Sequence, residues 1–414
     1  MSGVTEHAWP NGLKALLLET HQAPIVCLSI WYRAGSRDDP PGGTGTAHLL
    51  EHLTYKGTHR HPKGEYDRIL HAQGALHNAS TWLDRTGYHI LIGNDRYPIG
   101  LELEADRMRG ACLDARDLRD EIPVVANEIA RNEDEPMAAL FERLQALAFL
   151  QHPYGHPVLG WSQDLEAASV EGLRGFYDHR YQPGNAHLAV VGDFRTETML
   201  AEITRTFGAI PPGPTPARRP VVEPPQRGER RFELRKAGRQ ELWAAAYKVP
   251  SRSHGDGYAL DVLAHVLGQG RTSRLYRALI ESGLAVGAGA ENQATPADPF
   301  LFLVDADLAR GASREKVEEA VEREIARLAR EPVGREEIDR ARKRARVEFV
   351  MRRDKVSAQA FLLGEFEATV GWRFVETYLE RLSAVEPEDV MRVAGRYLVR
   401  EERTVGHFRP TDGS

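Results

Sequence analysis

The chain has 414 residues, of which 42% are hydrophobic and 28% are charged, and its formal net charge is −6. This composition is typical of a globular protein, and the length predicts at least two domains because single cores stop growing near about 250–300 residues. The charge excludes a strongly basic surface for nucleic acid or anionic membrane, and no run of about 18 apolar residues predicts a transmembrane helix. We expect a cytoplasmic protein because residues 1–7 lack the basic and apolar regions of a secretory signal. Cys27 and Cys112 lack C-x-x-C spacing, so we expect no disulfide.

Strands and helices alternate through the first half of the chain. Branched and aromatic residues predict strands at 13–19 and 24–33, and a loop rich in Gly and Pro then leads to a helix that Thr44 or Thr46 would cap. The following elements are predicted, in order, as a helix at 64–72, strands at 75–80 and 86–92, helices at 99–109, 120–132, 136–150 and 170–179, and a strand at 186–191.

The second half repeats this order after a segment rich in proline and charge. Its predicted elements are a strand at 242–249, a helix at 257–267, a strand at 300–306, helices at 314–329, 336–352 and 387–397, and a strand at 403–408. We therefore predict an α+β fold with two similar domains, each a mostly antiparallel sheet packed with helices. The boundaries are 1–210 for the N-terminal domain, 211–230 for the linker and 231–414 for the C-terminal domain.

The first predicted helix of the chain carries His48, Glu51 and His52 in the spacing H-x-x-E-H. Residues four apart lie on one face of a helix, so both imidazoles can reach one metal ion, with a carboxylate beside them. So short a pattern also arises by chance, in which case the histidines would be ordinary surface or core residues. The C-terminal domain has no equivalent motif.

A catalytic zinc normally has three protein ligands. The best candidate for the third is Glu128, on a predicted helix that Asp120 would cap and that has Pro123 in its first turn. Glu121 is seven residues before Glu128 and shares its face. The alternative is that this acidic helix is merely a solvated surface.

The chain resembles the inverted-zincin family that includes pitrilysin, insulin-degrading enzyme and mitochondrial processing peptidase. The resemblance rests on residues 45–58 (GTAHLLEHLTYKGT), 76–81 (LHNAST) with Thr86 and Tyr88, 105–108 (ADRM), 124–128 (VVANE), 152–155 (HPYG) with Gly160 and Trp161, 181–185 (YQPGN) and 191–193 (VGD). It runs in order through residues 10 to 195 and continues more weakly to about 410.

The resemblance implies one Zn²⁺ per chain, with His48, His52 and Glu128 as its ligands. It also implies that Glu51 is the general base and that Glu121 orients a ligand.

The resemblance further implies that Asn78 and Ala79 lie on an edge strand to which a peptide substrate adds. By its residue type alone, Asn78 could instead be a turn residue.

The C-terminal half departs from the family pattern. Where the family carries an Arg and a Tyr that approach the substrate, this chain has Ile280 and Val286, and Tyr276 and Arg277 stand at the wrong spacing. Loss of such an electrophilic donor should cost activity. We therefore predict that a homologous second subunit supplies the Arg/Tyr pair in a dimer, and we expect a heterodimer.

Two functions remain open at this point. The first is a zinc metalloendopeptidase that hydrolyses short or unfolded peptides, or a processing peptidase with a defined cleavage site. The second is a non-catalytic structural subunit of a related complex, although such chains usually lose motif residues that this chain retains.

Overall fold

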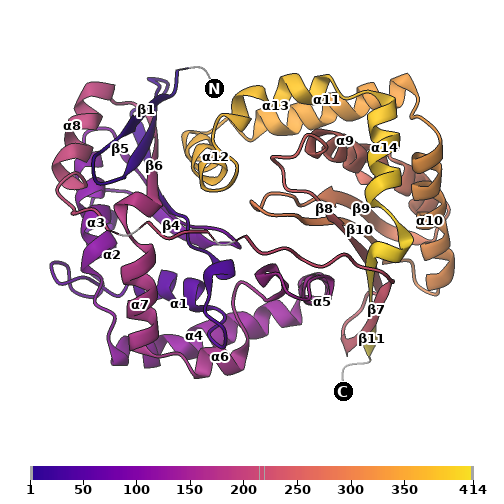
Figure 1. The fold of residues 1–414 in the computed structure, drawn as a ribbon, viewed down its shortest axis with the longest axis horizontal. Coiled ribbons are helices and arrows are strands. Elements are labelled where there is room, and N and C mark those ends of the chain that lie inside the picture. The colour runs from indigo at the N-terminus through magenta and orange to yellow at the C-terminus, as the bar shows by residue number, and fades with distance from the viewer. Residues whose placement is uncertain (1–2, 214, 219, 412–414) are drawn as a thin grey trace. The chain divides into compact units, whose positions relative to one another are not determined.

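The computed structural model describes residues 3–213, 215–218 and 220–411, and its contacts divide the chain into two compact units (Figure 1). The N-terminal unit comprises Met1–Ile129, His156–Pro220 and Met351–Glu376, and the C-terminal unit comprises Ala130–Gly155, Val221–Val350 and Thr377–Ser414. Each unit thus includes one segment from the other half of the sequence.

The elements of the N-terminal unit are β1 (Thr5–Ala8), β2 (Lys14–Glu19), β3 (Ile25–Tyr32), η1 (Ser36–Asp38), α1 (Thr46–Leu53), α2 (Glu65–Ala72), β4 (Leu76–Thr81), β5 (Thr86–Gly93), α3 (Tyr97–Gly110), most of α4 (Ala115–Asp134), α6 (Ser162–Glu166), α7 (Val170–Arg180), η3 (Pro183–Asn185), β6 (Ala186–Gly192), α8 (Thr196–Thr206) and α12 (Val356–Thr369). Those of the C-terminal unit are α5 (Pro136–Ala148), η2 (Pro153–Gly155), β7 (Arg230–Ala237), β8 (Leu242–Val249), α9 (Gly257–Gly268), η4 (Tyr276–Ile280), β9 (Ala285–Asn292), β10 (Phe300–Leu308), α10 (Arg314–Arg330), α11 (Arg335–Met351), most of α13 (Phe374–Ser383), α14 (Pro387–Tyr397), η5 (Arg400–Glu402) and β11 (Arg403–Thr411). No helix among the described residues is long and apolar enough to cross a membrane.

The two sheets share one topology. The N-terminal sheet has the order β1-β2-β6-β3-β5-β4 and the C-terminal sheet has the order β7-β11-β8-β10-β9. If the extra strand β1 is set aside, each sheet places its first strand beside its last, and this is its one parallel pair (β2 with β6, β7 with β11); the other pairs are antiparallel. The predicted α+β fold with two similar, mostly antiparallel domains is confirmed.

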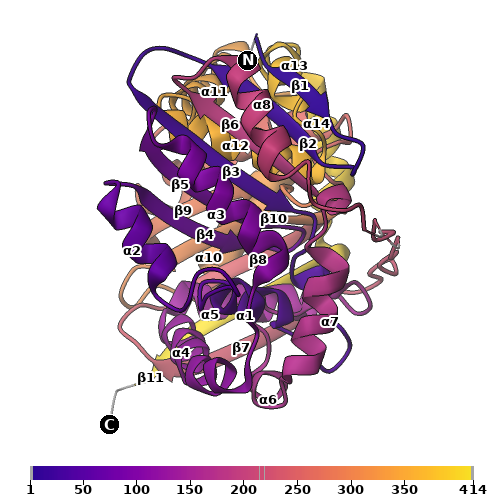
Figure 2. The ribbon, with the colours of Figure 1, turned by 90° about the vertical axis from the view of Figure 1, so that its left-hand side faces the viewer.

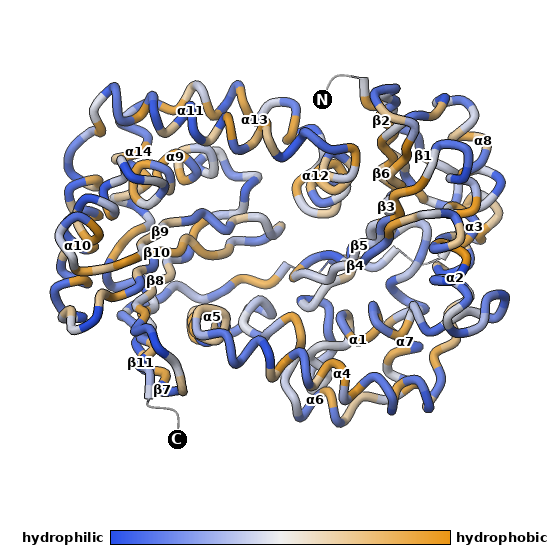
Figure 3. The backbone as a smooth tube through the Cα atoms, turned by 180° about the vertical axis from the view of Figure 1, so that it is seen from behind, coloured by the Kyte–Doolittle hydropathy of each residue, from blue (hydrophilic) through white to orange (hydrophobic). Residues whose placement is uncertain are grey.

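The N-terminal sheet is buried on both faces, which explains the nearly continuous apolar sequence of β3. Val26, Leu28 and Ile30 point into the main core, whereas Cys27 and Trp31 pack under α12 on the opposite face. Figure 3 shows the hydrophobic colour along β3 and β6, and Figure 2 shows the helices α1 to α3 on the side that faces the viewer. Both cysteines of the chain are free.

The contacts assign two segments differently from the predicted boundaries at 210 and 231. The helix α5, predicted in the N-terminal domain, packs on β8 and β11. The helix α12, whose residues fall within the predicted C-terminal domain, packs on β3 and β6. Which face of a remote sheet a helix covers depends on tertiary packing, which the order of elements does not reveal. Of the predicted linker, the described residues before Arg230 form no helix or strand.

The helix α4 begins earlier than its sequence suggested. It starts at Ala115, and the carboxylate of Asp114 accepts hydrogen bonds from the backbone N–H groups of Arg116 and Asp117, both at 2.9 Å. The prediction that Asp120 caps this helix is therefore wrong, and Pro123 lies inside the helix rather than in its first turn. A helix tolerates proline best at its start, and that preference misled the prediction.

Candidate metal centre

A side chain from the loop before α1, that of Asp39, accepts hydrogen bonds from the backbone at the start of that helix. Gly45, with φ of 85°, precedes the first helical residue, and the Asp39 carboxylate accepts hydrogen bonds from the N–H groups of Gly45 (2.7 Å) and Ala47 (2.8 Å). Thr44 instead donates to Asp164 at 2.6 Å, and Thr46 donates to a loop carbonyl. The prediction that either threonine caps α1 is wrong, because Asp39 satisfies the free N–H groups of the first turn.

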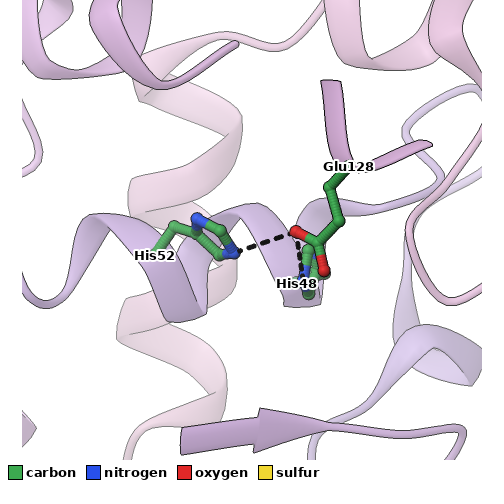
Figure 4. A group of neighbouring side chains, drawn as sticks. All are labelled: His48, His52 and Glu128. Carbon is green, nitrogen blue, oxygen red and sulfur yellow. Dashed lines mark ion pairs between the residues drawn. The ribbon is translucent and has the colours of Figure 1, made fainter. Parts of the chain in front are cut away.

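Three donor atoms from α1 and α4 converge on one point. The Nε2 atoms of His48 and His52 lie 3.8 and 3.7 Å from Oε2 of Glu128, and all three donors lie within 4.8 Å of one another. Figure 4 shows Glu128 reaching down between the two imidazoles of the α1 helix. The structure thus brings together the three residues predicted as metal ligands.

The donor set and its spacing fit Zn²⁺. Bonds of about 2.0–2.2 Å in a tetrahedron separate the donors by roughly 3.3–3.5 Å, close to the separations found here. No other group of three His, Cys, Asp or Glu side chains in the described part of the chain is arranged in this way. Two imidazoles and one carboxylate leave a fourth position for water or substrate, as catalytic zinc sites do.

Glu121 fixes the orientation of His52. Its Oε1 accepts a hydrogen bond from Nδ1 of His52 at 2.9 Å, which leaves the lone pair on Nε2, and its Oε2 lies 2.5 Å from Nζ of Lys56. Burial opposes ionisation of Glu121, but the hydrogen bonds from His52 and Lys56 outweigh it and lower its pKa to about 2. Burial opposes protonation of His52, but its hydrogen bond to Glu121 and the nearby charges of Glu51 and Glu128 outweigh burial and raise its pKa, so protons and metal compete for Nε2.

His48 is the more deeply buried ligand. Burial, with a smaller effect of nearby His52, lowers its pKa to about 3, so the ring is neutral at physiological pH and its Nε2 can bind a metal. Its Nδ1 is buried and has no hydrogen-bond partner among the described residues.

Glu51 lies on α1 beside the rings of His48 and His52, but its side chain contacts β4 rather than Glu128. The side chain is buried, and its Oε2 accepts a hydrogen bond from the hydroxyl of Thr81 on β4 at 2.5 Å. Burial raises the pKa of Glu51, and the hydrogen bond from Thr81 offsets part of that effect. A buried carboxylate with a raised pKa is suited to accepting a proton.

A buried cation lies behind α1. The Arg107 guanidinium is paired with Glu104 and stacks over the rings of Tyr55 (4.7 Å) and Tyr88 (3.9 Å). The Tyr88 hydroxyl in turn lies 3.0 Å from that of Thr54, at the end of α1. These contacts fix α1 to the sheet.

The sequence reasoning gave no role to Thr81, Lys56 or Arg107, although all three fall in segments that carried the resemblance. Lys56 could have been found from its position four residues after His52, and Thr81 from the alternation of β4, which places Ala79 and Thr81 on one face.

Asn78 and Ala79 lie on β4, the last strand of its sheet. Asn78 is exposed, and its side-chain oxygen accepts a hydrogen bond from the N–H of Ala79 at 2.9 Å. An edge strand of this kind offers backbone groups to an added strand, so the role of both residues in substrate binding stays a prediction.

The positions where the family pattern has Arg and Tyr lie in the C-terminal unit. Ile280 ends η4 and is partly buried, whereas Val286 lies on β9 with 65% of its surface exposed. Neither side chain can donate a hydrogen bond.

Comparison with known proteins agrees with this architecture. The family model described as "Insulinase (Peptidase family M16)" matches residues 14–161, and "Peptidase M16 inactive domain" matches residues 167–345. The chain is 28% identical to the zinc protease PqqE of Helicobacter pylori, covering 97% of this chain and 91% of that protein. It is 27% identical to an uncharacterized zinc protease of Streptomyces coelicolor, covering 94% and 86%.

Solved structures show the same fold. The crystal structure of a protease from Helicobacter pylori matches with a TM-score of 0.93 at 28% identity, covering 99% of this chain and 100% of that chain. A putative M16-like peptidase from Alicyclobacillus acidocaldarius matches with a TM-score of 0.88 at 20% identity, covering 99% and 98%. The chain is therefore a member of peptidase family M16, the insulinase and pitrilysin family of inverted zincins, in its short two-domain form.

Proposed function

We propose that this chain is a zinc metalloendopeptidase that hydrolyses short or unfolded peptides and holds one Zn²⁺ through His48, His52 and Glu128. The observation that carries the proposal is the convergence of three donor atoms at 3.7–3.8 Å, with the second nitrogen of His52 hydrogen-bonded to Glu121. A bound Zn²⁺ supplies the Lewis acid that polarises the scissile carbonyl and lowers the pKa of a water.

The protein residues divide the remaining work. Glu51 accepts the proton of the attacking water and passes it to the leaving amine, for which its burial and raised pKa are suited. Glu121 holds His52 in the tautomer that leaves Nε2 free.

The peptide binds as an added strand along β4 at Asn78 and Ala79. In that arrangement the peptide competes with the hydrogen bond from the N–H of Ala79 to the side chain of Asn78.

A homologous second chain completes the active site in a dimer, in our proposal a heterodimer. The support is that Ile280 and Val286 are apolar where the family pattern carries an Arg and a Tyr that approach the substrate. The purified chain should therefore be nearly inactive on unstructured peptides, and activity should appear when the partner is added. Full activity of the chain alone would contradict the need for a partner. The subunits of the native complex, isolated by pull-down, would identify the partner. The cytoplasmic location of the protein stays a prediction.

Zinc content and hydrolysis together test the proposed function. We expect the wild-type chain to bind about one zinc and Glu51→Gln to retain that metal while losing hydrolysis in the assembled enzyme. Glu51 contacts Thr81 rather than the metal-ligating atoms, so the substitution should leave the site able to bind zinc. Absence of zinc from the wild-type chain would instead support the non-catalytic structural subunit.

A further inference from the structure

The hydroxyl of Thr81 is the one hydrogen-bond donor to the Glu51 side chain among the described residues. Thr81 is the last residue of β4, and β4 packs against α1. Its Oγ1 lies 2.5 Å from Oε2 of Glu51, and both side chains are largely shielded from solvent. The other carboxylate oxygen of Glu51 accepts no hydrogen bond from the described part of the chain.

The neighbouring Thr86 determines where the Thr81 proton goes. The two threonines are paired across β4 and β5, with their hydroxyl oxygens 3.3 Å apart. Thr86 is fully buried and donates its own proton to the carbonyl of Ala34 at 2.8 Å, so it can only accept from Thr81. At 2.5 Å, Oε2 of Glu51 is a much closer acceptor than the Thr86 hydroxyl at 3.3 Å, and it therefore takes the Thr81 proton in preference to Thr86.

The hairpin that carries Thr81 is held firmly. The N–H of Trp82 donates to the carbonyl of Arg85 at 2.8 Å and closes the four-residue loop between β4 and β5. The Arg85 guanidinium donates to the hydroxyl of Ser80 (3.0 Å) and to the Glu365 carboxylate (3.0 Å). The position of the Thr81 hydroxyl is therefore set by the fold before any ligand arrives.

We propose that Thr81 is a positioning residue that fixes the rotation of the Glu51 carboxylate. By engaging Oε2, its hydroxyl presents the other oxygen of Glu51 to the proton of the attacking water. The proposal rests on the general-base function proposed above for Glu51. A valine at this position fills the same space without a hydroxyl and leaves the buried carboxylate free to rotate.

The test compares Thr81→Val and Thr81→Ser in the zinc-loaded enzyme in its native assembly. A hydrogen bond to a charged group orients a reacting atom, so we expect kcat of Thr81→Val to fall about 10- to 100-fold, with KM and zinc content unchanged. Thr81→Ser keeps the hydroxyl and should recover most of the lost kcat. If the valine variant fails to fold, Thr81→Ala replaces it.

Ser29→Ala is the matched control. Ser29 is a buried hydroxyl in the same sheet that donates to the carbonyl of Ala189 at 2.8 Å, away from the metal centre. Its loss should lower thermal stability about as much as Thr81→Val while leaving kcat unchanged.

Three results would overturn the role of Thr81. These are a valine variant with wild-type kcat, a serine variant no better than valine, or a loss of zinc in proportion to the loss of kcat. Failure of the underlying function gives a different result, because wild type and Glu51→Gln would then have the same activity.

Discussion

The two units contain sheets of the same topology but differ in the helix that follows β3 in the N-terminal sheet and β8 in the C-terminal sheet. In the N-terminal unit α1 follows β3 and carries His48 and His52, four residues apart, with ring nitrogens directed at Glu128. In the C-terminal unit α9 follows β8 and carries Asp261 and His265 at the same spacing. The spacing is retained in both helices, but the residue types differ.

The Asp261 carboxylate on α9 is engaged in structural hydrogen bonds. The Asp261 carboxylate accepts hydrogen bonds from Asn292 and from the Tyr378 hydroxyl, both at 2.8 Å. Nε2 of His265 lies 3.7 Å from Glu348. On α1, by contrast, both positions hold histidines, and their Nε2 atoms converge on the one carboxylate of Glu128 at 3.8 and 3.7 Å. A metal centre therefore requires lone pairs that the fold leaves available, in addition to helical spacing.

The edge strands differ in the same sense. On β9 the Ala290 carbonyl accepts a hydrogen bond from the side chain of Gln269 at 3.0 Å, and Gly268 lies directly against this strand. The end of α9 therefore occupies part of that edge. On β4, the edge strand of the other sheet, the side chain of Thr81 contacts Glu51 of α1.

The largest expected effect is on zinc binding and hydrolysis, and it should distinguish His52 on α1 from His265, which stands at the equivalent position of α9. We expect His52→Ala to reduce bound zinc from about one per chain to near zero and hydrolysis to background, because two donors do not hold a catalytic zinc. His265→Ala should change neither. Metal analysis and a peptide assay on the assembled enzyme measure both quantities. Zinc retained by His52→Ala would place the metal elsewhere.

A smaller effect is expected from the residue that orients His52. Glu121→Gln keeps an oxygen for the His52 ring but removes the charge, and such substitutions typically cost about 10- to 100-fold in metal affinity or activity. Asp120→Asn, an exposed carboxylate on the same helix, is the matched control and should leave the zinc dissociation constant unchanged. Equal affinities for the two variants would show that Glu121 does not support the ligand.

Much of the fold could be predicted because apolar patterns repeat. The strands β2, β3, β5, β8, β10 and β11 and the helices α5, α7, α10, α11 and α14 fall within a few residues of their predicted bounds, because each has a clear apolar period. The strands β1, β7 and β9 and the helices α6, α8, α12 and α13 were not predicted. β7 alternates exposed and half-buried residues, and β9 is rich in Gly and Ala, so neither has the apolar pattern of a core strand.

The three residues that converge at the candidate metal centre could be predicted because they are local or share a helix face. His48 and His52 lie on one helical turn, and Glu128 was chosen from an acidic helix with the help of a resemblance. The predicted caps were wrong for two different reasons. Asp39 acts on α1 from a preceding loop, outside the position where a cap is usually sought. Asp114 is an ordinary N-cap of α4, but the helix begins before the residues whose pattern predicted its start. The alternation of β4 places Thr81 on the same face as Ala79, but it does not reveal the contact with Glu51, which depends on how β4 packs on α1.

The smallest effect tests whether the C-terminal unit uses its own buried acids for structure alone. Asp305 on β10 lies over Gly289 of β9, where a Cβ would be only 2.8 Å from its Oδ1. Burial, together with nearby Asp307 and Glu291, raises the pKa of Asp305 from 3.8 to about 6. The folded chain therefore binds this proton more tightly than the unfolded chain does.

The stability contributed by this proton is present below pH 4 and is lost as the pH rises towards and beyond 6, the pKa in the folded chain. Asp305→Asn cannot ionise, so at pH 8 it should be about 1–3 kcal/mol more stable than wild type, since one pKa unit corresponds to about 1.4 kcal/mol. Below pH 4 the two proteins should unfold alike. Thermal unfolding at pH 4 and pH 8 measures this, with the exposed Asp339→Asn on α11 as the control. An equal gain at both pH values would assign the effect to hydrogen bonding of the amide. A wild-type activity of Asp305→Asn would agree with a structural role for this acid.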